Sequence, residues 1–192
     1  MQTPSPDEGG EWRRDWFGII DRKDLPEKIK WECFVDGAYT KDTKNDPTGI
    51  QVAGSDGINL YIFSSIDKYL EMPQLKSFIA PHLNSLGIDV KMTLVEPKAS
   101  GKSLVQLLRY ETRLQVSEIK GDFVKMSKIE RARASSPYIE GGRVFLVRGG
   151  WNESFLNQIA MFPNAKHDEH IDLTAYAIER NFIKNNGKYN VM

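Results

Sequence analysis

Acidic residues stand at the ends of predicted secondary-structure elements, where carboxylates can bind metal ions. Asp36 follows the apolar run 31–35 and Glu96 follows the apolar run 90–95, and both runs are typical of short strands. If the two strands lie side by side and parallel, both carboxylates project from the same edge of the sheet. Clustered carboxylates repel one another unless cations lie between them, and hard oxygen ligands select Mg²⁺ or Mn²⁺. The sequence therefore predicts a divalent metal site, and two such ions can hold the attacking and leaving oxygens of a phosphodiester.

Further acids surround the start of the last predicted helix. Asp168 opens this helix, Glu169 follows it, and Asp172 shares a helix face with Asp168 because the two are four residues apart. His167 precedes Asp168, where it orients that carboxylate, shuttles a proton, or packs without a chemical role. Simpler interpretations stay open, since Asp36 can be a turn residue before a glycine and Asp168 can be a helix N-cap.

Two other kinds of site fit the sequence less well. The segment 101–103 reads Gly-Lys-Ser, like the end of a P-loop, but the first glycine of that motif falls on Glu96, and Pro97 removes a backbone donor. A carboxylate at that position repels the phosphate, so a P-loop kinase is disfavoured. Zinc is disfavoured as well, because the cysteine and the histidines show no ligand spacing.

A local excess of basic residues lies between positions 120 and 133. Lys128 and Arg131 are three residues apart on a predicted helix, so they can face one track of DNA phosphates. A solvated helix face is the alternative. The residues predicted to bind DNA are Lys125, Lys128, Arg131 and Arg133, with Lys41 and Lys44 as additions to the path.

The bulk composition excludes several classes of protein. The 192 residues include 26 Lys and Arg together and 26 Asp and Glu together, so no global basic field indicates nucleic-acid binding. The single Cys33 excludes an intrachain disulfide and is typical of a reducing compartment. No apolar stretch approaches the length of a membrane span, and the polar N-terminus lacks the apolar centre of a signal peptide.

The remaining pattern predicts a mixed α/β sheet with helices on its faces. Two strands at 49–53 and 58–63 flank a Gly-Ser-Asp-Gly hairpin turn, and the later strands alternate with helices. The apolar stripe 75–86 predicts a helix, and Pro81 within it predicts a kink or a break. Further strands are predicted at 114–119 and 143–147, and further helices at 104–108, 126–134, 151–161 and 168–183.

Four stretches carry a family resemblance in the order in which they occur. They are FVDGAYT (34–40), LVEPKASGKSLVQLL (94–108), KMSKIERARASSPYIEGGRVFL (125–146) and FPNAKHDEHIDLTAYAI (162–178). Over most of its length, the chain resembles the C-terminal nuclease domain of the large terminase subunit of tailed bacteriophages. The resemblance implies an RNase H-like fold, in which an antiparallel meander and parallel strands carry helices on both faces. It also implies a divalent-metal endonuclease that cuts concatemeric viral DNA before and after genome packaging.

The resemblance also assigns roles to single residues. It places the catalytic metal ligands at Asp36, Glu96 and Asp168, around two Mg²⁺ or Mn²⁺ ions, with Glu169 and Asp172 as alternate or supporting ligands and His167 beside them. The family often has a second Asp directly after His-Asp, where this chain has Glu169, and a second acid where this chain has Pro97. These departures put the shape and strength of the second ion site in doubt.

The organisation and partners follow from the same resemblance. Residues 1–30 are interpreted as a flexible lead-in and an aromatic linker segment, 31–184 as the RNase H-like nuclease domain, and 185–192 as a tail. The implied partners are double-stranded DNA, an ATPase motor domain that this sequence does not supply, the small terminase subunit and the portal. The implied location is the host cell cytoplasm during virion assembly, without a membrane. An RNase H-like Holliday-junction resolvase and a non-enzymatic DNA-packaging adaptor are the alternatives.

Overall fold

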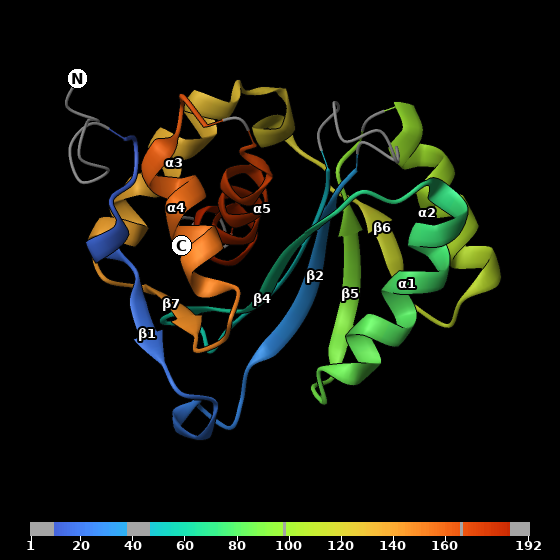
Figure 1. Cartoon of the computed structure of the whole chain (residues 1–192), viewed down its shortest axis with the longest axis horizontal. Helices are drawn as coiled ribbons and strands as arrows, with labels where there is room; N and C mark the ends of the chain where they lie inside the picture. Colours follow the sequence, from blue (N-terminus) through green and yellow to red (C-terminus); the bar gives the residue numbers. More distant parts are fainter. Residues whose placement is uncertain (1–9, 38–46, 98, 166, 185–192) are drawn as a thin grey trace, which may run out of the picture.

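The central sheet contains both parallel and antiparallel strands. The computed structural model describes residues 10–37, 47–97, 99–165 and 167–184, and within these residues seven strands form one sheet (Figure 1). The strands are β1 (Gly18–Ile20), β2 (Lys30–Asp36), β3 (Thr48–Ser55), β4 (Leu60–Lys68), β5 (Val90–Val95), β6 (Val116–Glu118) and β7 (Val144–Val147). Their order across the sheet is β1-β7-β4-β3-β2-β5-β6.

The strand pairing confirms the predicted combination of an antiparallel meander with parallel strands. β2, β3 and β4 pair antiparallel in sequence, whereas the β2–β5, β5–β6, β4–β7 and β1–β7 pairs are parallel. The predicted turn between β3 and β4 forms because the Asp56 side chain accepts hydrogen bonds from the backbone N–H groups of Ile58 and Asn59.

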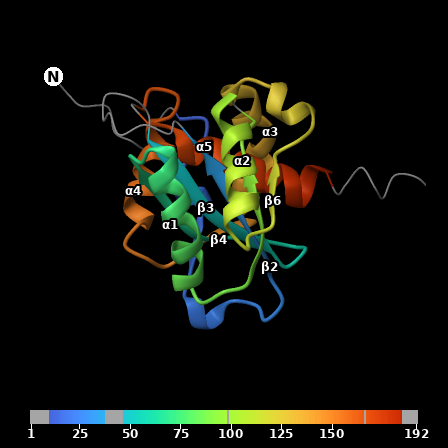
Figure 2. The ribbon, with the colours of Figure 1, turned by 90° about the vertical axis from the view of Figure 1, so that its right-hand side faces the viewer.

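Helices cover both faces of the sheet, as the sequence predicted. The helices are α1 (Met72–Ser85), α2 (Ala99–Glu111), α3 (Lys128–Glu140), α4 (Asn152–Met161) and α5 (Glu169–Ile178), with short 3-10 helices η1 (Arg14–Trp16), η2 (Arg22–Asp24) and η3 (Asp122–Lys125) and a π-helical turn η4 (Glu179–Ile183). Figures 1 and 2 show α1 and α2 on one side of the sheet and α3, α4 and α5 on the other. α1 continues through Pro81, so the break expected at this residue does not occur. None of the described helices is long and apolar enough to cross a membrane.

Each face of the sheet carries its own hydrophobic core, because side chains alternate along a strand. Phe34 of β2 packs in the core beneath α5, while its neighbours Cys33 and Val35 pack in the core beneath α1 and α2. Burial raises the pKa of the Cys33 thiol to about 12, so this thiol stays protonated and serves as a packing group. β2 is therefore covered on both sides, and only its end is positioned to reach a site.

Helix α5 lies inside the protein, because all of its residues are buried. A helix that is covered all round belongs to the core. Its polar side chains are bonded to the sheet: the His170 Nδ1 lies 2.9 Å from Ser65 Oγ, and the Thr174 hydroxyl donates to Gln51 Oε1 at 3.2 Å. Gly49 of β3 lets the helix approach closely, since a Cβ there would lie 2.9 Å from side-chain atoms of α5. These contacts fix which face of α5 points toward the ends of β2 and β5.

The N-terminal segment is part of the same structure. Trp12 is 1% exposed and donates its Nε1–H to the Ala132 carbonyl of α3 at 2.9 Å, and Phe17 packs edge-on against Phe155 of α4. β1 pairs with β7. The sheet therefore begins before residue 31, the predicted start of the domain. β1 was not predicted because a three-residue strand is too short to show a period-two pattern. The outer parts of the predicted lead-in and tail, 1–9 and 185–192, lie outside the described residues.

Candidate metal centre

Two of the predicted acids meet at the carboxyl ends of neighbouring strands. Asp36 is the last residue of β2, and Glu96 directly follows β5. The two strands are parallel, with Val35 opposite Val95, and the Glu96 backbone N–H donates to the Val35 carbonyl at 2.9 Å. The expected juxtaposition of these carboxylates at one sheet edge is therefore present.

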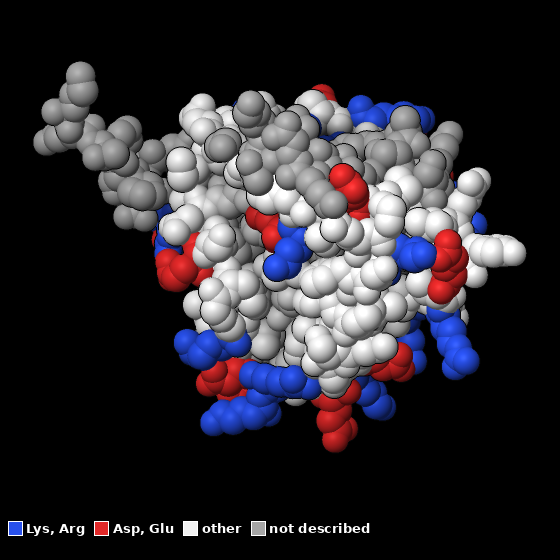
Figure 3. Space-filling view, turned by 45° about the vertical axis from the view of Figure 1, so that its right-hand side comes forward, with Lys and Arg blue, Asp and Glu red and all other residues white. Residues whose placement is uncertain are grey.

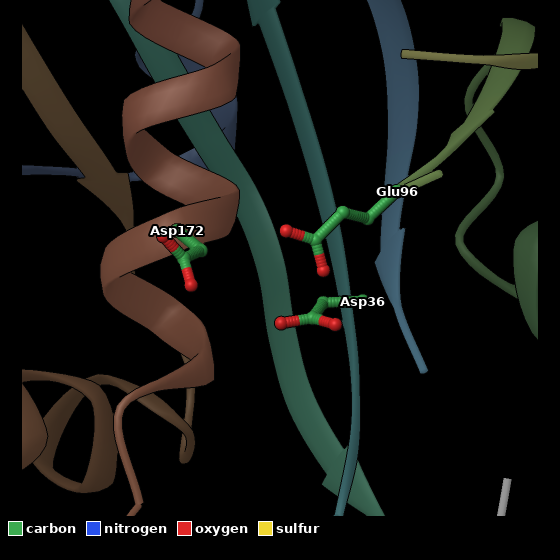
Figure 4. A group of neighbouring side chains, drawn as sticks. All are labelled: Asp36, Glu96 and Asp172. Carbon is green, nitrogen blue, oxygen red and sulfur yellow. The ribbon is translucent and has the colours of Figure 1, made fainter. Parts of the chain in front are cut away.

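The third carboxylate comes from α5. Asp172 lies in the first turn of this helix and joins Asp36 and Glu96 in a group whose carboxylate oxygens all lie within 4.8 Å of one another. Figure 4 shows the strand-end side chains directed toward the helix that carries Asp172. The exposed fractions of the residues are 3% for Asp36, 7% for Glu96 and 2% for Asp172. Three acids distant in sequence thus converge in a buried position.

Asp168 lies outside this group among the described residues. It is the N-cap residue of α5, its side chain is 31% exposed, and its Oδ1 accepts a hydrogen bond from the Lys128 Nζ at 2.5 Å. The family resemblance implied a primary role for Asp168 and a supporting one for Asp172, whereas the structure brings Asp172 to the strand ends. Asp168 and Asp172 share a face at the start of α5, about one helical turn apart. The position in which α5 docks on the sheet therefore decides which of the two carboxylates reaches Asp36.

The other residues predicted at the start of α5 lie outside the three-carboxylate group among the described residues. Glu169 is 3% exposed and lies against Gly49 of β3. The His167 Nε2 lies 3.3 Å from the Tyr69 hydroxyl, and its Nδ1 lies 3.9 Å from Glu169 Oε1. Neither residue belongs to the three-carboxylate group.

Two cations from α3 neutralise Asp172. Arg131 donates from Nε and Nη2 to Oδ1 at 2.9 and 2.5 Å, and the Lys128 Nζ lies 2.9 Å from Oδ2. Burial lowers the pKa of both cations and is the largest single effect, but the charges and hydrogen bonds of the surrounding acids, Asp172 foremost, together raise the pKa of Lys128 and of Arg131 above the ordinary values. The ion pairs thus offset part of the repulsion among the three carboxylates.

Tyr176 contacts a second carboxylate of the group. It lies one helical turn after Asp172 on α5, and its hydroxyl donates to Glu96 Oε1 at 2.8 Å. Burial, together with the negative charge of Glu96, raises the pKa of Tyr176 well above its usual range. Tyr176 is not among the residues predicted from the sequence, although its spacing of four residues from Asp172 places both on one face of the helix.

The basic residues predicted to bind DNA occupy three kinds of position. Arg131 is 6% exposed and is bonded to Asp172, whereas Lys128 is partly buried between Asp168 and Asp172. Lys125 and Arg133 are exposed and pair with Asp122 and Glu11. Lys41 and Lys44 lie outside the described residues.

The described surface carries mixed charge on the face that Figure 3 presents. Lys and Arg side chains alternate there with Asp and Glu, and the described residues form no continuous basic surface on that face. This pattern agrees with the zero formal net charge of the chain. Any DNA path over the described residues on this side therefore depends on single cations rather than on an extended positive field.

The chemistry of the three-carboxylate group fits a hard divalent cation. All three ligand groups are carboxylates, and oxygen ligands of this kind select Mg²⁺ or Mn²⁺. Buried carboxylates this close together repel one another, and a divalent cation between them would offset that repulsion. The residues present are therefore suited to bind such an ion.

Comparison with known protein families identifies one that matches this chain. A family model described as the terminase RNaseH-like domain matches residues 34–180, well over half of the chain. A search of curated protein sequences gave no match.

Solved structures of viral terminases share the fold. The human cytomegalovirus terminase nuclease domain, described as Mn soaked and inhibitor bound, is 14% identical, with a TM-score of 0.62 over 93% of this chain and 97% of that chain. The large terminase nuclease of thermophilic phage G20c, described as having bound zinc, is 12% identical, with a TM-score of 0.61 over 87% of this chain and 95% of that chain. The HK97 bacteriophage large terminase is 11% identical, with a TM-score of 0.65 over 90% of this chain. The present chain covers 43% of that HK97 chain.

Proposed function

This chain belongs to the terminase RNase H-like domain family, and from this premise we propose that it is the metal-dependent DNA endonuclease domain of a viral DNA-packaging terminase large subunit. Its role would be to cut concatemeric phage DNA by phosphodiester hydrolysis. The observation that carries the proposal is the convergence of Asp36, Glu96 and Asp172 at the ends of β2 and β5 and on α5.

We propose that these three carboxylates hold the divalent ion. An Mg²⁺ or Mn²⁺ ion held by these residues would supply Lewis-acid chemistry toward water and a phosphodiester oxygen. The protein's own contribution is to fix the carboxylates on two strand ends and one buried helix. The Asp168 carboxylate, which lies outside the group, and Glu169 remain candidates for supporting a second ion, as the family resemblance implied.

We propose that DNA contact falls to the exposed and partly exposed cations of the α3 region. The side chains of Lys125 and Arg133 are 79% and 67% exposed. Exposed ion pairs stabilise a protein by only about 0.2–1 kcal/mol, so these side chains can exchange their present partners for phosphates. Lys128 lies against Asp172 of the three-carboxylate group and is 28% exposed, so it is well placed to meet a phosphate at the site. Arg131 is excluded from this role because it is buried against Asp172.

Cleavage of supercoiled plasmid by the purified chain tests the proposal. With Mn²⁺ the chain should convert plasmid to nicked and linear forms, and a chelator should stop the reaction. Asp36→Asn, Glu96→Gln and Asp172→Asn should each abolish this activity because each removes a ligand charge from the group.

Asp168→Asn is the matched control within α5. Because Asp168 lies outside the group, its loss should reduce cleavage by no more than about tenfold, the lower end of the effect of a supporting residue. Circular dichroism should show that all four variants keep the wild-type fold. Full activity of Asp172→Asn, or no cleavage by wild-type protein at any Mn²⁺ concentration, would contradict the proposal.

The wider setting is also part of the proposal. The ATPase motor domain, the small terminase subunit, the portal and the host cytoplasm remain expectations from the family. A Holliday-junction resolvase would cut branched DNA in preference to linear duplex, and a packaging adaptor would bind DNA without cutting it. Parallel assays on junction, linear and plasmid substrates separate these three functions.

A further inference from the structure

A connected set of side chains reaches two of the three carboxylates from inside the protein. We propose that Arg131 and Tyr176 are positioning residues, which hold the carboxylates of Asp172 and Glu96 in the orientation that metal binding requires. This inference rests on the proposed function, because it assigns a role toward the same ion. Arg131 thus serves the metal centre rather than the DNA.

Arg131 is fixed on both sides of its guanidinium group. Two of its nitrogens donate to Asp172 Oδ1, while Nη1 donates to the backbone carbonyls of Met126 at 2.9 Å and Val124 at 3.5 Å. These carbonyls belong to η3 and to the C-cap residue after it. The carboxylate of Asp172 is therefore tied to backbone on a different segment from its own helix. A planar donor group with several N–H bonds suits this task, and a lysine cannot reproduce it.

Tyr176 extends the same set to Glu96. The Arg131 guanidinium carbon lies 5.1 Å from the centre of the Tyr176 ring, and the Tyr176 hydroxyl donates to Glu96 Oε1. Asp172 and Tyr176 lie on one face of α5, so the helix that supplies the third carboxylate also orients the second. Glu96 follows the end of its strand, and this hydrogen bond fixes one of its oxygens where the strand no longer does.

A simpler role for Arg131 is to offset the negative charge of the group. That role depends on charge alone, so it predicts that changes which keep the charge leave metal affinity unaltered. Positioning depends on geometry, so it predicts that the same changes weaken metal binding. Tyr176→Phe keeps the ring and removes the hydroxyl, while Arg131→Lys keeps the charge and removes the planar donor group.

Calorimetric titration with Mn²⁺ alone decides between the two roles. Tyr176→Phe and Arg131→Lys should each raise the Kd for Mn²⁺ by about tenfold or more, as loss of hydrogen-bond partners around metal ligands does. Tyr138→Phe is the matched control: Tyr138 stacks on Phe182, and its substitution should leave the Kd unchanged. Melting temperatures measured without metal show whether any variant acts through the fold instead.

The outcomes separate this inference from the proposed function. If wild-type protein binds Mn²⁺, Asp36→Asn does not, and Tyr176→Phe binds as tightly as wild type, the positioning role is overturned while the proposed function stands. If wild-type protein does not bind Mn²⁺, both are overturned. Should Arg131→Lys fail to fold, Tyr176→Phe decides alone, because it removes one hydroxyl and no charge.

Discussion

Asp172 is bonded to a cation through each of its carboxylate oxygens, and the two cations differ in their access to solvent. The Arg131 side chain is 8% exposed and holds Oδ1, whereas the Lys128 side chain is 28% exposed and holds Oδ2. Lys128 also pairs with Asp168. Arg131 is therefore held in place by burial, whereas Lys128 is a partly exposed point charge that would compete with a bound metal ion for Oδ2.

Replacing Lys128 with Met should tighten Mn²⁺ binding in the absence of DNA. Removing a competing, partly exposed cation favours the ion by about 1 kcal/mol, which is roughly a fivefold lower Kd. Calorimetry measures the change. Lys125→Met is the control, because Lys125 pairs with Asp122 and should leave the Kd unaltered. Weaker Mn²⁺ binding by Lys128→Met would show that Lys128 supports the site rather than competing for it.

Sequence reasoning found the strand-end acids because each directly follows, or ends, an apolar run. The family resemblance placed Asp168 ahead of Asp172, whereas Asp172 is the one that reaches the strand ends, since both lie on one face of the helix and only the docking of α5 separates them. The role of Tyr176 was not predictable, because an aromatic residue at helical spacing is typical of packing in a hydrophobic core. Arg131 was assigned to DNA because a basic helix face gives no sign of which cation turns inward.

Among the helices and strands, the geometry of the three-carboxylate group depends on how closely α5 lies against the sheet. The helix carries one carboxylate, and the strands β2 and β5 carry the other two, so their separation sets the size of the centre. Gly49 of β3 pairs with Asp36 and lies beneath Glu169 and Leu173 of α5. The absence of a side chain at Gly49 is what allows this close approach.

Gly49→Ala should push α5 away from the strand ends. The added Cβ would lie 2.9 Å from both Glu169 Cβ and Leu173 Cδ1, closer than such atoms can approach. Overpacking of this kind costs about 1–3 kcal/mol of unfolding free energy, and it should weaken Mn²⁺ binding as well. Urea unfolding and calorimetry measure the two effects.

Gly150→Ala is the control for that substitution, because a Cβ at Gly150 meets nothing within 4 Å. It should change the unfolding free energy by less than about 0.5 kcal/mol. Equal effects of the two substitutions would show that the loss at Gly49 comes from the backbone and not from α5.

The elements themselves were largely predictable. The apolar run 90–95 predicted a strand with the same bounds as β5, and the glycine-flanked turn predicted the β3–β4 hairpin. β1 escaped prediction because it is three residues long and is a strand only by pairing with β7. Pro81 sits inside a continuous α1 because the packing of Leu75, Ile79 and Leu83 against the sheet outweighs the lost hydrogen bond.

At the scale of the whole molecule, the N-terminal segment supports the helix that supplies both cations. Trp12 donates to the carbonyl of Ala132, the residue next to Arg131, and packs in the core on that face of the sheet. Phe17 and β1 attach the same segment to α4 and β7. Residues that the sequence marked as a linker therefore support the position of α3.

Trp12→Ala should destabilise the protein by about 3–5 kcal/mol, as large-to-small changes at buried aromatic residues do. Thermal and urea unfolding measure the loss. Ile19→Ser tests an exposed apolar residue of the same segment, which is 45% exposed, and should cost less than about 0.5 kcal/mol. A loss of unfolding free energy below about 1 kcal/mol for Trp12→Ala would show that the N-terminal segment contributes little to the stability of the fold.

The order of the carboxylates along the chain has a consequence during protein synthesis. Asp36 and Glu96 leave the ribosome well before Asp172, which lies on α5 near the end of the described fold. Domains generally fold as units during synthesis, so the complete fold requires that α5 has emerged. A nascent chain that has not yet released α5 lacks one of the three carboxylates, so the group that we propose to bind a metal ion cannot form until translation has passed this helix.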